Sequence, residues 1–63
     1  MCGMNWYREQ LAKADDDEER LSELMKMMEE RYKISLNHPE EWGKVNSDVI
    51  YVYKEIASRI GLI

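Results

Sequence analysis

Apolar side chains between residues 5 and 35 recur at intervals of three and four, a spacing that places them on one face of an α-helix. One position in this series, Glu18, is charged instead of apolar. The spacing predicts a long helix over residues 5–35, about 46 Å in length at about 1.5 Å per residue. The members of the apolar series are Tyr7, Leu11, Ala14, Leu21, Met25, Met28 and Tyr32.

The acidic run at residues 15–19 permits a second interpretation. An aspartate there can cap a new helix, with Glu18 or Glu19 completing a capping box. However, no Gly or Pro marks a turn, and Ala14 and Leu21 keep their seven-residue spacing across the run. We therefore favour one continuous helix, with a three-helix monomer broken near Asp15 as the alternative.

The rest of the chain predicts a loop over residues 36–45 and a second helix over residues 46–60. Pro39 cannot continue a helix built before it, but it suits the first position of a short helical turn. Asn46 or Ser47 can cap the second helix, and Gly61 follows its end. The expected fold is all-α: a single domain over residues 1–63, arranged as an antiparallel helical hairpin with a long first helix.

The second helix of such a hairpin is about half as long as the first, so it leaves the beginning of the apolar stripe uncovered. A 63-residue chain is marginally stable without added support, and its single cysteine, Cys2, excludes an internal disulfide. We expect a homodimeric helical bundle in which a second copy covers the stripe. The predicted dimer interface consists of Tyr7, Leu11, Ala14 and Leu21.

The net charge of −4 argues against direct binding of nucleic acid and against anionic membranes. No apolar run approaches the roughly 20 residues that cross a bilayer. We expect a cytoplasmic protein.

The sequence offers few candidate residues for catalysis or metal binding. The only histidine, His38, stands in the predicted loop beside Glu40 and Glu41. A zinc site needs three or four ligands, and the single cysteine, Cys2, lies far from His38 in the sequence. The acidic run lacks the spaced oxygens and the glycine of a calcium loop. We therefore predict no catalytic residue, no metal and no cofactor, and expect that the chain is not an enzyme.

Several large apolar residues fall outside the core-facing stripe. Met27 and Ile34, seven residues apart, share the opposite side of the first helix, and Tyr51 lies on the polar side of the second. Trp42 stands in the loop, where it either caps the core or faces a partner. Methionines and aromatic residues anchor many protein interfaces. Met27, Ile34, Trp42 and Tyr51 are therefore the predicted partner-binding residues.

The segment 36–40, Leu-Asn-His-Pro-Glu, lies before the second helix, and with Ser47 its outline resembles the small helical-hairpin phosphatases that act on response-regulator aspartyl phosphates during sporulation. The Ser-Gln-Glu-Leu-Asp motif of that family is absent, since Asp48 and Val49 follow Ser47. The resemblance implies an alternative function as an aspartyl-phosphate phosphatase-like regulator near His38, Glu41 or Asp48. The favoured hypothesis is a small acidic, noncatalytic adaptor or inhibitor that binds and regulates another protein. A structural oligomerisation module is a further alternative.

Overall fold

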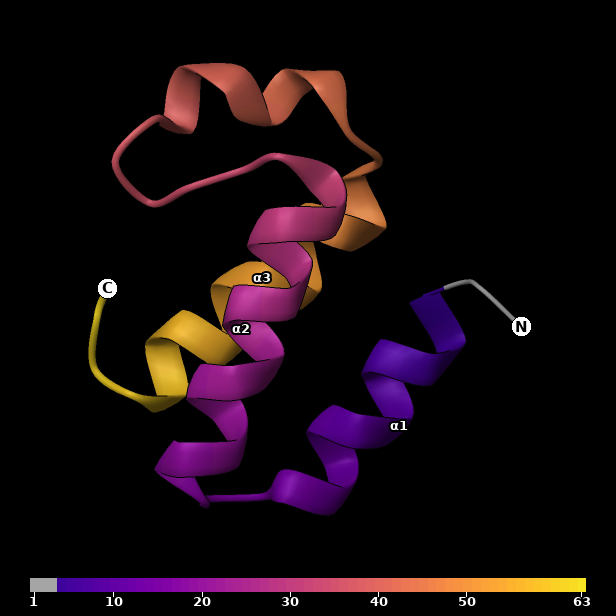
Figure 1. Ribbon diagram of the computed structural model, residues 1–63, viewed down its shortest axis with the longest axis vertical. Coiled ribbons are helices and arrows are strands. Elements are labelled where there is room, and N and C mark those ends of the chain that lie inside the picture. Colours follow the sequence, from indigo (N-terminus) through magenta and orange to yellow (C-terminus); the bar gives the residue numbers. More distant parts are fainter. Residues whose placement is uncertain (1–3) are drawn as a thin grey trace.

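The computed structural model describes residues 4–63, and every regular element in that range is a helix (Figure 1). Three α-helices, α1 (Met4–Ala14), α2 (Glu18–Tyr32) and α3 (Ser47–Arg59), are joined in sequence, with the 3-10 helix η1 (Pro39–Lys44) between α2 and α3. The predicted all-α class is confirmed. Cys2 lies outside the described residues.

The continuous helix predicted over residues 5–35 is wrong, because the chain breaks between α1 and α2. Asp15 adopts a left-handed conformation with a φ of 54°, which ends α1. Asp17 is extended and is the N-cap of α2. Its Oδ1 accepts hydrogen bonds from the backbone N–H groups of Glu19 at 3.1 Å and Arg20 at 3.3 Å. These bonds satisfy amides that have no partner within the helix.

Arg59 on α3 also stabilises the turn between α1 and α2, which we call the corner. Nη1 of Arg59 donates to the backbone carbonyl of Asp15 at 3.2 Å and to that of Leu11 at 3.5 Å. A guanidinium is favourable there, because the carbonyls at a helix C-terminus carry partial negative charge. Nε of the same side chain bonds Glu55 at 3.3 Å. Arg59 therefore fixes the corner against the end of α3.

The three α-helices enclose one core. Figure 1 shows α1 and α2 side by side in opposite directions, with α3 passing behind α2, and α3 contacts both of them. Arg8 on α1 pairs at 3.3 Å with Asp48, which lies in the first turn of α3. The buried residues of the core are Tyr7, Ala14, Leu21, Leu24, Met25, Met28, Ile34, Val49, Val52, Tyr53, Ile56 and Ala57.

The break changes the role of the predicted dimer-interface residues. Tyr7, Ala14 and Leu21 are at most 6% exposed, and Leu11 is half-buried against the same core. Because α1 folds back beside α2 and lies against α3, the stripe that one long helix would have exposed is covered within a single chain. The reason for expecting a second copy at these four residues is therefore lost.

The loop after α2 closes the end of the core. Nε1 of Trp42 on η1 donates to the carbonyl of Ser35 at 2.8 Å, and its ring meets the Tyr53 ring edge to face at 5.5 Å. Nζ of Lys54 lies 5.7 Å from the centre of the Trp42 ring. Trp42 thus links the loop to α3, where the predicted second helix over residues 46–60 is found as Ser47–Arg59.

Replacing Asp17 with Ala should lower the free energy of unfolding by about 0.5–2 kcal/mol, because the amides of Glu19 and Arg20 lose their acceptor. Urea denaturation followed by circular dichroism measures the change. Asp16→Ala is the matched control, since Asp16 is exposed and makes no side-chain hydrogen bond to residues 4–63. That control should stay within about 0.5 kcal/mol of the unchanged protein. Equal losses in the two variants would contradict the capping role.

Candidate functional site

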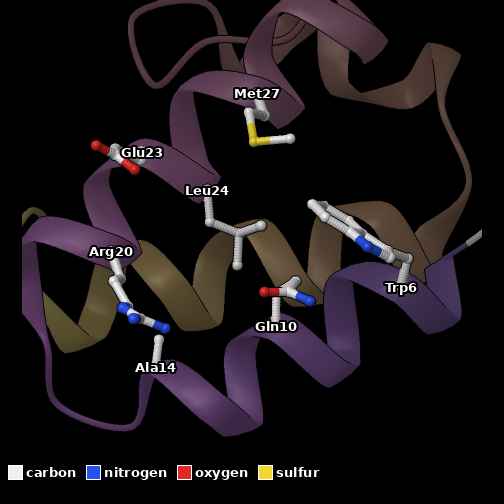
Figure 2. Close-up of a pocket in the computed structure, with 7 residues that line it drawn as sticks. All are labelled: Trp6, Gln10, Ala14, Arg20, Glu23, Leu24 and Met27. Atoms are coloured by element: carbon white, nitrogen blue, oxygen red, sulfur yellow. The ribbon is translucent and has the colours of Figure 1, made fainter.

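A groove lies between α1 and α2, on the side of these helices away from α3 (Figure 2). Its volume is about 280 Å³. We call it the α1–α2 groove. It is lined by Trp6, Gln10 and Ala14 from α1 and by Arg20, Glu23, Leu24 and Met27 from α2.

The floor of the groove is apolar and continuous with the core, whereas its walls are exposed. Ala14 and Leu24 are buried at its base. Trp6 and Met27 lie on opposite walls at one end, 39% and 46% exposed (Figure 2). Arg20 lies toward the other end, near the corner between the helices. The groove therefore combines an apolar end with a polar one.

A second cavity continues the α1–α2 groove along α2. It has a volume of about 390 Å³ and shares Met27 with the groove. Tyr7 contributes from α1, and Glu30 and Arg31 contribute from the following turn of α2. Met27 therefore borders both cavities, with charged side chains of both signs on either side of it.

Aromatic contacts fix the position of the groove end that carries Trp6. Tyr7 is buried, and its ring centre lies 5.0 Å from that of Trp6 and 5.9 Å from that of Tyr32. The Tyr32 hydroxyl also contacts the sulfur of Met4 at 3.4 Å. These aromatic contacts hold the beginning of α1 against the end of α2, so Trp6 is placed beside the α1–α2 groove by its neighbour Tyr7.

Of the four predicted partner-binding residues, only Met27 lines the α1–α2 groove. Ile34 is 3% exposed and belongs to the core, and Trp42 is half-buried against Tyr53. Tyr51 is 67% exposed on α3, outside the groove lining. The structure does not bring the four together.

Trp6 is the exposed aromatic residue of the groove that the sequence interpretation missed. It precedes Tyr7, the first member of the core-facing series, so on a helix it lies at the border of the buried face. Its spacing of four from Gln10, and of eight from Ala14, places these three side chains along one edge of α1. That border position, together with its large aromatic side chain, was the available signal.

The residues considered for chemistry lie elsewhere. Nδ1 of His38 is 3.1 Å from Oε2 of Glu40, and both side chains are exposed. A backbone hydrogen bond, followed by the His38 contact, lowers the Glu40 pKa. Asp48 is paired with Arg8. Within residues 4–63, no three His, Cys, Asp or Glu side chains are grouped to hold a metal ion.

Among residues 4–63, the most perturbed titratable group is inside the fold. Tyr53 is fully buried, and its hydroxyl donates to Oε2 of Glu29 at 2.6 Å. Burial raises the Tyr53 pKa above its ordinary value, and the hydrogen bond and negative charge of Glu29 raise it further. The hydroxyl is thus kept protonated as a donor that ties α3 to α2, away from the α1–α2 groove.

Comparisons with known protein families, with curated proteins and with solved structures give no match to this chain. None of the described helices is both long enough and apolar enough to cross a bilayer.

The Tyr53–Glu29 bond predicts that the protein loses stability in alkaline solution. The folded-state pKa of Tyr53 is raised, so its contribution is complete below the unfolded value near 10 and is lost as the pH rises above it. Tyr53→Phe should lower the unfolding free energy at pH 7 by about 1 kcal/mol, through loss of the hydrogen bond. It should also make the alkaline decline shallower.

Urea denaturation between pH 7 and pH 11 measures both effects. Some decline should remain in the Tyr53→Phe variant, because burial also raises the pKa of Tyr7. Tyr51→Phe is the control, since it removes an exposed hydroxyl from the same helix. An unchanged alkaline profile in Tyr53→Phe would refute the assignment.

Proposed function

We propose that this chain is a small, noncatalytic protein-interaction module that binds a protein surface through the α1–α2 groove. An adaptor or inhibitor of this kind acts by occupying a surface of its target. The observation that carries the proposal is the pairing of exposed Trp6 with exposed Met27 across a groove whose floor is apolar.

The side-chain types support this function. Tryptophan gives a large contact area with few rotatable bonds, and methionine adapts its shape to different partners. Both are partly exposed here, although burial of either would stabilise a chain this small. Exposed apolar residues gathered in one groove are a typical mark of a binding site, whereas scattered ones are not.

The polar residues of the groove support it as well. Arg20, Glu23 and Gln10 offer hydrogen-bond donors and acceptors around the apolar end. Apolar contacts surrounded by polar groups are the usual composition of a protein interface. Another cavity, between α2 and the C-terminal residues, lacks an exposed aromatic side chain; its lining includes Lys26, Leu36 and Leu62.

Site-specific photocrosslinking tests the proposal in the source cell. The photoreactive residue p-benzoylphenylalanine replaces Met27 in one variant and Tyr51 in another, since both native side chains are exposed but only Met27 lines the groove. Irradiation should join the Met27 variant to a defined protein chain, identified by mass spectrometry. The Tyr51 variant should not give the same adduct.

Circular dichroism confirms beforehand that both variants retain the helical fold. Competition by an excess of the unmodified protein should remove the adduct from position 27, because specific binding is saturable. Absence of an adduct at position 27, or the same adduct from position 51, would refute the α1–α2 groove as the binding surface.

A further inference from the structure

The acidic run at residues 15–19 lies at the corner, beside one end of the α1–α2 groove. Ala14 lines that end from α1 and Arg20 lines it from α2, so the run joins the two walls of the groove. Glu23, one turn further along α2, lines the groove itself. All of these acidic residues are exposed. The groove therefore extends from its apolar end to an end bordered by carboxylates.

The cations near the corner already have partners within the chain. Nε of Arg20 lies 3.8 Å from Oδ2 of Asp17. Lys13 and Arg59 each pair with a glutamate on their own helix. The carboxylates at this end that have no ion-pair partner within residues 4–63 are Asp15, Asp16, Glu18, Glu19 and Glu23. This end of the groove thus carries a local excess of negative charge.

The other charges along α2 do not offset this excess. Glu30 and Arg31 are neighbours of opposite charge, and both border the adjoining cavity. Arg31 is already engaged within the chain, with its guanidinium carbon 5.9 Å from the centre of the Tyr32 ring. Lys26 borders the separate cavity beside the C-terminal residues. The charge that the α1–α2 groove presents to a partner is therefore set by its acidic end.

The groove also has a form that receives a helix. α1 and α2 lie side by side in opposite directions, and α3 contacts both of them from behind (Figure 1). A helix laid in the groove repeats this packing on the opposite side of the α1–α2 pair, which gives a four-helix arrangement. Ala14 is small, so at the base of the groove it leaves room for an apolar side chain of such a helix (Figure 2).

We propose that the partner in the α1–α2 groove is a basic amphipathic helix of another protein. Its apolar side chains pack between Trp6 and Met27, and its lysines or arginines face the carboxylates at the corner. Trp6 and Ala14 stand eight residues apart, about 12 Å along α1, so the apolar and basic residues of the partner lie about two turns apart on one face. The net charge of −4 favours the approach of a basic chain. This proposal rests on the proposed function and names the chemistry of its partner.

NMR titration of the full chain with a synthetic peptide tests the proposal. The probe is an alanine-based peptide of about 15 residues, the length at which such sequences become helical in water. It carries leucines on one face and lysines about two turns away on the same face. The indole N–H resonance of Trp6 should shift, whereas that of Trp42, which packs against Tyr53, should not. A peptide with glutamates in place of the lysines should bind at least about tenfold more weakly.

Charge reversal locates the acidic end. Glu23→Lys should weaken binding of the lysine peptide by about tenfold, because an attraction becomes a repulsion. Glu41→Lys is the matched control, since Glu41 is an exposed residue on η1 without an ion-pair partner within residues 4–63. It changes the net charge equally but leaves the groove unaltered, so binding should stay within about twofold of the unmodified chain. Circular dichroism shows that both variants are folded.

Three results would overturn the proposal: equal binding of the lysine and glutamate peptides, equal effects of the two substitutions, or no shift of the Trp6 resonance up to millimolar peptide. The photocrosslink at position 27 separates this failure from that of the proposed function. An adduct with a second copy of this chain, or with a segment that is not a basic helix, overturns only the basic helix. Absence of any adduct also overturns the proposed function.

Discussion

The cap that Asp17 places on α2 is the interaction on which the fold depends. A residue in extended conformation reverses the chain between two helices, and its carboxylate satisfies the amides that the reversal exposes. Arg59 then fixes the corner by bonding the carbonyls at the end of α1. Without the reversal, α1 would extend beyond α3, and Tyr7 and Ala14 would have no cover within the chain. The corner thus makes a closed core possible with so few residues.

Much of the fold could be predicted from the sequence, because the three- and four-residue spacing survives within each helix. The break was misjudged for a physical reason. Aspartate is only slightly unfavourable inside a helix, yet it is among the best N-caps, so the same residues suit both structures. The charged Glu18 in the apolar series was the informative sign. It occupies the first turn of α2, where an acidic residue is favoured.

The candidate site was harder to predict, because it depends on where helices end. Ile34 was grouped with Met27 on the assumption that the helix continues to residue 35. Instead Lys33, with a φ of 59°, ends α2 in a left-handed conformation and turns Ile34 into the core. The helix ends before Ile34, so the seven-residue spacing from Met27 no longer places Ile34 on the exposed side of α2. Met27 lies well inside α2, and its predicted exposure is observed.

A partner that bound in the proposed α1–α2 groove would be physically coupled to the angle between the two helices. Trp6 belongs to one wall and Met27 to the other, and a single reversal at residues 15–17 joins the helices that carry them. A partner chain that contacts both walls binds the folded arrangement of α1 and α2 and not the unfolded state. Its binding energy therefore adds to the stability of the fold. In a domain with so small a core, that contribution is a large part of the total. The exposed Trp6 and Met27 would then weaken the isolated chain and strengthen the complex, which is the balance expected of a module whose stable form is the bound one.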